Sequence, residues 1–251
     1  MSSDWTILAW TVAAALLMWL VQRQLHKHIQ GLVLLVTGKE HLVPVAHFLL
    51  LLPGIVLHEC SHWLAAKLLG VRVGSMSIGP QRKRGKQMRF GSVQIGRTDA
   101  IRESLIGLAP LVSGTALVLL LARWGFGLLP TTELQPATWP GQLVACLRAE
   151  DAWLWVYLIF AVANAMLPSA SDRRAWRTFG LYLGLVAALA IGLLGMPKGT
   201  ETWLQWGLHF LSYLAYAFSL TTLVDLGALA LVLVLEWAVG HLTGRRIQYG
   251  S

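Results

Sequence analysis

Five consecutive residues carry the side chains most able to do chemistry: His58, Glu59, Cys60, Ser61 and His62. On a helix, residues four positions apart lie on the same face, so His58 and His62 can direct ring nitrogens at one metal ion. Glu59 can reach a water on that metal without being a ligand. This is the H-E-x-x-H spacing of zinc hydrolases, in which the glutamate is the general base. The motif predicts Zn²⁺ bound by His58 and His62, with Glu59 as the catalytic residue.

The surroundings of the motif favour a functional interpretation. Residues 48–57 are almost wholly apolar, and residues 63–69 contain one charge. Ionisable side chains are expensive in a membrane segment and usually mark a functional site. The alternative is a pair of histidines satisfied by hydrogen bonds inside a helix bundle, and it does not explain a glutamate in the same turn.

The composition indicates a multi-pass integral membrane protein. Of 251 residues, 56% are hydrophobic and 13% are charged, which excludes an ordinary soluble globule. A net charge of +8 would suggest nucleic acid as the partner of a soluble protein. Here the basic residues lie between apolar stretches, so we expect them to set orientation and contact the lipid bilayer, with no nucleic-acid partner.

The apolar stretches predict an all-α polytopic fold of about six transmembrane helices in one membrane-embedded domain, residues 1–251. The core is expected at 42–178 and C-terminal helices at 179–242. Residues 31–37 either extend the first helix or lie in the interface, and 203–219 are expected to be interfacial. The expected spans are 5–21, 42–69, 104–122, 152–167, 179–196 and about 220–242.

Residues 71–97 are the one stretch that predicts β structure. Two segments with strand character, 72–78 and 88–95, flank a polar turn, so we expect a small membrane-associated β-hairpin after the second span. Its basic residues are typical of a cytoplasmic loop under the positive-inside rule. Its edge strand is also suited to receive an extended substrate by β-addition.

A catalytic zinc usually has three protein ligands, so the two histidines need a third. Asp172 is the first choice, because it follows Pro168 in an irregular stretch at the same expected depth as the motif. Its alternative role is to cap a following helix. Asp225 is the second choice, either as the ligand or as a polar partner, because it interrupts an apolar helix. Placing the most basic loops inside predicts a prokaryotic plasma membrane protein with its active site toward the cytoplasm.

With these motifs, the chain resembles the site-2 protease family of intramembrane zinc metalloproteases. The residues from Asn164 to Asp172 look like the family's second motif, an Asn-x-x-Pro run that leads to the ligand aspartate, although Pro168 is one place late and Arg173 stands where a glycine follows. Residues 107–110 look like its Gly-Pro segment. The similarity covers about residues 45–175 and implies a divergent, minimal core without a PDZ or nucleotide-binding domain.

The resemblance implies hydrolysis of peptide bonds in or near transmembrane segments of membrane protein substrates, as in regulated intramembrane proteolysis. It implies that Asn164 binds the unwound substrate backbone. Three alternatives remain: a non-catalytic metal-binding membrane protein that binds partners, a membrane zinc protease of another class, and a transporter. The oligomeric state stays open at this stage.

Overall fold

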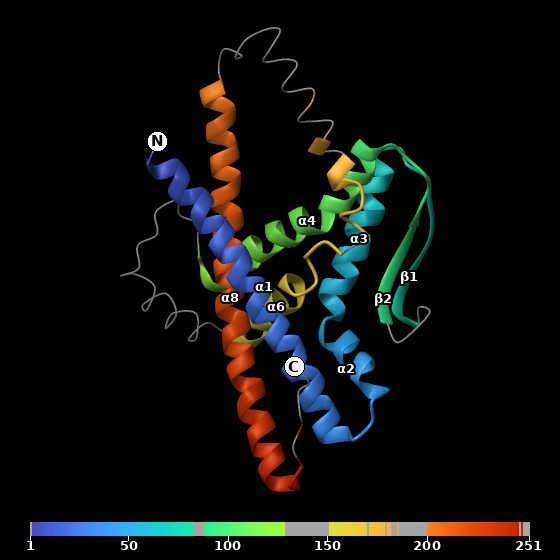
Figure 1. The fold of residues 1–251 in the computed structure, drawn as a ribbon, viewed down its shortest axis with the longest axis vertical. Coiled ribbons are helices and arrows are strands. Elements are labelled where there is room, and N and C mark those ends of the chain that lie inside the picture. Colours follow the sequence, from blue (N-terminus) through green and yellow to red (C-terminus); the bar gives the residue numbers. More distant parts are fainter. Residues whose placement is uncertain are drawn as a thin grey trace.

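The computed structural model describes residues 2–82, 88–128, 151–169, 171–178, 180–181, 185, 200–245 and 247 (Figure 1). Helices dominate, and two strands form a small antiparallel sheet. The prediction of a helical membrane fold with a β-hairpin is therefore confirmed. The elements are α1 (Ser2–Thr37), α2 (Leu42–Leu50), α3 (Leu52–Leu68), β1 (Val73–Arg82), β2 (Met88–Ile95), α4 (Ala100–Phe126), α6 (Ala152–Ala163) and α8 (Thr200–Thr243).

The prediction of six spans is wrong for the part of the chain that the structure describes. Helices α1, α4 and α8 are long and apolar enough to cross a membrane, and the bent pair α2–α3 brings the number to four. Helix α6 has 12 residues, about 18 Å at 1.5 Å each, which is short of the roughly 30 Å hydrocarbon core. The expected fifth span, 179–196, lies almost wholly outside the described residues.

Helix α1 continues through the polar stretch 22–30, beyond residue 21, where the first span was expected to end. Its inward side chains recur every three or four residues across this stretch, so one buried face runs unbroken along the helix. Arg23 and Lys27 lie on the exposed face, where their charge does not interrupt packing. Residues 31–37 extend this helix, as one of the two expectations had it. The buried residues of this face are Thr11, Ala14, Met18, Val21, Gln22, Leu25 and Ile29.

Helix α8 is one continuous helix, so the expected division into an interfacial segment at 203–219 and a span from about 220 is not marked by a break. It runs in the same direction as α1 and crosses it obliquely (Figure 1), and polar contacts join the two helices. The Trp10 Nε1–H donates to Ser219 Oγ at 3.1 Å near one end, and His28 contacts Glu236 at 2.7 Å near the other. These contacts hold α1 and α8 as a pair beside the remaining helices.

Glycines let the other helices approach α6 closely. A Cβ atom on Gly54 of α3 would collide with the backbone of Ala161, and one on Gly114 of α4 would collide with Met166. Such small residues are common at helix contacts in membranes because they bring backbones together. Helices α3 and α4 therefore flank α6 and the chain that follows it.

The hairpin pairs Val73 with Ile95, Ser77 with Ser92 and Ile78 with Gly91, which places it within the expected range 71–97. It lies along the outer side of α3 (Figure 1). The Phe90 ring of β2 packs on Phe48 and His47 of α2. The hairpin is thereby anchored to both halves of the bent α2–α3 pair.

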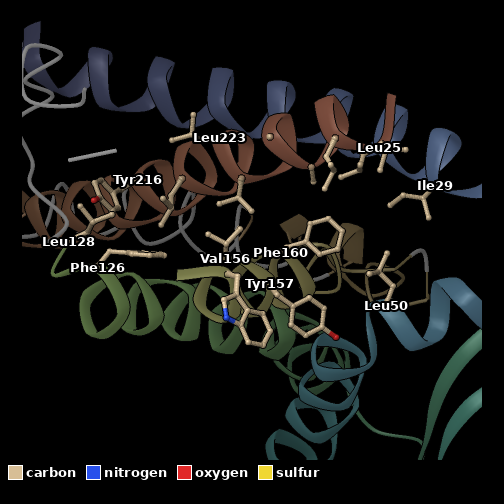
Figure 2. Close-up of a pocket in the computed structure, with 17 residues that line it drawn as sticks. Leu25, Ile29, Leu50, Phe126, Leu128, Val156, Tyr157, Phe160, Tyr216 and Leu223 are labelled. Carbon is tan, nitrogen blue, oxygen red and sulfur yellow. The ribbon is translucent and has the colours of Figure 1, made fainter. Parts of the chain in front are cut away.

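An apolar cavity of about 700 Å³ lies between the α1–α8 pair and α6 (Figure 2). Side chains from both sides line it, among them Leu25, Tyr157, Phe160 and Leu223. The residues of the His-Glu motif do not line this cavity. It is therefore separate from the candidate site described below.

Candidate metal centre

The α2–α3 break positions the motif. The two helices meet at an angle of 73°, and Pro53 is the second residue of α3, where its missing N–H leaves no helical bond unmade. Five residues later the helix presents the H-E-x-x-H residues, of which Glu59, Ser61 and His62 are buried. The exposed residue of the motif is Cys60, which points away from the others.

The structure brings His58, His62 and Asp172 together, and they form the one such cluster among the residues that it describes. The two imidazole Nε2 atoms are 3.1 Å apart. Asp172 Oδ1 lies 3.3 Å from His62 Nε2, and Asp172 Oδ2 lies 3.6 Å from His58 Nε2. Their side chains are between 8% and 14% exposed, so water has little access to the cluster.

The other ring nitrogen of each histidine decides its protonation. His58 Nδ1 lies 2.7 Å from the Ala165 carbonyl, and His62 Nδ1 lies 2.9 Å from the Ile106 carbonyl. A carbonyl oxygen can only accept, so each Nδ1 carries a proton and donates it. In neutral imidazoles both Nε2 atoms then present lone pairs, and these converge with the carboxylate of Asp172. Three electron-rich atoms this close together favour a cation among them.

The separations can be compared with those expected for a metal ion with tetrahedral ligands, such as zinc. Ligands at roughly 2.0–2.1 Å from zinc in tetrahedral geometry lie about 3.3 Å from one another. The Nε2–Nε2 separation of 3.1 Å and the nearest distances to the two different oxygens of Asp172, 3.3 and 3.6 Å, lie near that value, and one ligand atom from each residue lies within 4.8 Å of the other two. Two histidines and a carboxylate also form a common ligand set of catalytic zinc, and hydrogen bonds from the far ring nitrogens are the usual way to orient them.

A tight turn presents Asp172. The Ser169 N–H donates to Asp172 Oδ2 at 2.7 Å, and Gly107 of α4 lies against the Asp172 backbone so closely that a Cβ atom would collide with its carbonyl. Burial by itself would raise the pKa of Asp172, but the hydrogen bonds that His58 and His62 donate when their Nε2 atoms are protonated, together with the one from Ser169, outweigh burial and hold this pKa below its ordinary value. The carboxylate is therefore charged and ready to bind a cation.

The turn of Asp172 depends on the helix that carries Gly107. Helix α4 begins at the N-cap Asp99, whose side chain accepts hydrogen bonds from the backbone of Ile101 and Arg102. The Arg102 bond is the largest cause of a lowered pKa at Asp99. This cap starts the helix that supplies both the Ile106 carbonyl and Gly107 to the cluster.

Glu59 lies beside the cluster, under the hairpin. Its side chain is buried, and a Cβ atom built on Gly91 of β2 would be 2.5 Å from Glu59 Oε1. Strand β2 thus passes directly over the glutamate, and glycine is the residue that leaves room for it. The position predicted for the general base is next to the one strand pair of the described structure.

Asp225 and Asn164 lie together, outside the metal cluster. Asp225 is 0% exposed, and it accepts hydrogen bonds from Asn164 Nδ2 at 2.7 Å and from Gln22 Nε2 at 3.1 Å. It is not part of the group that could hold a metal. The structure therefore places Asp172 with the histidines and gives Asp225 the role of a polar partner.

Comparison of the chain with protein-family models, curated proteins and solved structures found no match.

Sequence reasoning missed four contributors to this site. They are the carbonyls of Ile106 and Ala165, and the close contacts of Gly107 and Gly91. A backbone carbonyl leaves no signature in the side-chain sequence. The glycines do leave one, since a glycine within a helix or strand often marks a close approach of another backbone or side chain.

Proposed function

We propose that the protein is an intramembrane zinc metalloprotease that hydrolyses peptide bonds in or near transmembrane segments of membrane proteins. One observation carries the proposal: the lone pairs of His58 and His62 converge with Asp172 at separations that suit zinc, in a chain with at least three helices able to cross a membrane. The neighbouring Glu59 makes the set complete for hydrolysis.

Each residue has a role in this proposal. His58, His62 and Asp172 hold the metal. Zinc in such a site activates water and polarises a carbonyl. Glu59 accepts the proton of the attacking water and delivers it to the leaving amine. A non-catalytic metal site needs the three ligands and has no use for the buried Glu59, which favours an enzyme.

The hairpin offers a strand edge to which an extended substrate could pair. A helical peptide bond is shielded, so a transmembrane substrate must unwind before cleavage, and its freed backbone groups then need partners. Strand β2 pairs with β1 and with no other strand among the described residues, and it passes over Glu59 at Gly91. We propose that an unwound segment pairs with the hairpin edge and so reaches the glutamate.

The decisive experiment compares the wild type with Glu59→Gln in detergent or liposomes. Metal analysis is expected to show one zinc per chain in both, and cleavage of a transmembrane peptide only in the wild type, since glutamine cannot accept the proton. Glu103→Gln is the matched control, because Glu103 is exposed in the first turn of α4. Cleavage by Glu59→Gln would refute the base assignment, and a wild type without zinc would refute the metal centre.

A further inference from the structure

Helix α6 ends inside the protein. The residue that follows it, Asn164, hydrogen-bonds Asp225, which lies near the middle of the 44-residue helix α8. The last turn of any helix leaves carbonyl groups without a helical donor. In a membrane protein these carbonyls need donors from other side chains, because little water is present to supply them.

Three side chains supply donors to this turn. Gln22 Nε2 of α1 lies 3.4 Å from the Ala163 carbonyl, and Asn164 Nδ2 donates to the Phe160 carbonyl at 2.9 Å. The third donor is the metal ligand His58, through its Nδ1 bond to the Ala165 carbonyl. The same turn of chain therefore contacts the α1–α8 pair on one side and the metal cluster on the other.

Asn164 is the centre of these contacts. Its Nδ2 donates to Phe160 O and to Asp225 Oδ1, and its Oδ1 accepts from His26 Nε2 at 3.0 Å. A carboxamide has two N–H groups, and both have partners within the protein. Asp225 in turn accepts from Gln22, so the side chains of α1 and α8 hold Asn164 from two directions.

We propose that Asn164 is a positioning residue of the metal centre. The cluster of Gln22, His26, Asn164 and Asp225 holds the last turn of α6 so that the Ala165 carbonyl meets His58 Nδ1. That bond sets which nitrogen of His58 carries the proton and where Nε2 points. Asp225 acts through Asn164, and Gln22 acts through Asp225 and through its contact with the Ala163 carbonyl. The inference rests on the proposed metal centre.

This role differs from substrate binding. A substrate backbone that used Asn164 as a donor would have to displace Asp225 or the Phe160 carbonyl, because no N–H of the side chain is left over. A positioning residue changes the metal centre itself when it is removed, with or without substrate. A substrate-binding residue changes KM and leaves the metal centre as it was.

The test uses full-length protein in which Co²⁺ replaces zinc, because the visible spectrum of Co²⁺ reports its ligand geometry. Asn164→Ala is expected to change this spectrum and to weaken Co²⁺ binding about 10- to 100-fold, the usual effect of losing a residue that orients a ligand. Asp225→Asn, which keeps the volume and loses one acceptor, is expected to cause the same spectral change with a smaller loss of affinity. If Asn164→Ala does not fold, Asp225→Asn tests the proposal in its place.

Ser219→Ala is the matched control. It removes the Trp10–Ser219 hydrogen bond between the same two helices, six residues before Asp225 on α8, and Ser219 contacts no residue of the Asn164 cluster among the described hydrogen bonds. It is expected to leave the spectrum and the affinity unchanged. The proposal is overturned if Ser219→Ala behaves like Asn164→Ala, or if Asn164→Ala and Asp225→Asn both keep the wild-type spectrum and affinity.

Failure of this inference is distinguishable from failure of the proposed function. A wild type that binds no Co²⁺ refutes the metal centre and with it the role of Asn164. A wild type that binds Co²⁺ while Asn164→Ala binds it identically, with a raised KM for peptide, refutes only the positioning role and assigns Asn164 to the substrate.

Discussion

Two carboxylates, Asp172 and Asp225, differ in the groups that surround them. Asp225 has amide N–H groups on both oxygens, from Asn164 and Gln22. Asp172 accepts one N–H from Ser169 and otherwise faces the two Nε2 atoms of the histidines. A carboxylate among donors is satisfied by the protein, whereas one among lone pairs is satisfied by a cation. Burial alone therefore does not identify a metal ligand.

The strongest test of which carboxylate is the metal ligand is to replace each one and measure the affinity for zinc. Asp172→Ala deletes a ligand, so we expect a loss of more than about 100-fold, beyond the usual effect of an orienting residue. Asp225→Asn is expected to stay within about tenfold of the wild type. Competition with a chromophoric chelator measures both, and a larger loss in Asp225→Asn would reverse the assignment.

For the free energy of unfolding, we expect the opposite order: replacing Asp225 should cost more than replacing Asp172. Asp225→Leu leaves the donors of Asn164 and Gln22 without acceptors in the interior, and each such group costs about 1–3 kcal/mol. We expect the free energy of unfolding of the metal-free protein to fall by about 2–4 kcal/mol on that basis. Asp172→Ala leaves the Ser169 N–H without its acceptor, but at an exposed site where water can replace it, so this free energy is expected to fall less than in Asp225→Leu.

Denaturation in mixed micelles with chelator present compares the two variants. Equal losses of stability in both would contradict the distinction between a satisfied and an unsatisfied carboxylate.

The support of Asp172 can be tested without touching its carboxylate. Gly107→Ala puts a methyl group into the Asp172 carbonyl, so the turn must shift and zinc affinity is expected to fall about tenfold, within the range for residues that orient ligands. Gly207→Ala is the matched control, since a Cβ atom there meets nothing within 4 Å. An unchanged affinity in Gly107→Ala would show that the turn adjusts freely.

A third buried carboxylate, Glu59, belongs to neither cluster. A substitution at its neighbour Gly91 can test the role of Glu59 without replacing it. Gly91→Ala crowds Glu59 from β2, and a flexible side chain can move aside at little energetic cost. We expect zinc content to stay at the wild-type level and kcat for peptide cleavage to fall several-fold, as for a general base moved off its ideal position. A kcat equal to that of the wild type would separate the hairpin from catalysis.

Sequence reasoning reached the elements of this site through periodicity. The i, i+4 spacing of His58 and His62 needs only a helix to bring the two rings together, and the helix is predicted by its own residues. The hairpin at 71–97 followed from strand-forming residues around a polar turn. These features depend on residues that are close together in the sequence, so they can be predicted without a tertiary structure.

The extent of the long helices was misread for a physical reason. Local hydropathy treats the polar residues 22–30 as a break, but the inward face of α1 continues through Leu25 and Ile29. The polar side chains of this stretch find partners on other helices, among them His26 with Asn164. A hydropathy profile contains no information about such tertiary partners.

The sequence by itself determined a helical membrane protein with a strand pair and a histidine pair poised for a metal, because each depends on short-range periodicity. Tertiary structure alone decided between Asp172 and Asp225. Both are single carboxylates in apolar surroundings, and they are distinguished only by the groups that face them, which for Asp225 come from 61 and 203 positions away in the chain. Lone pairs face one and amide protons face the other, and only the folded chain brings those groups within reach.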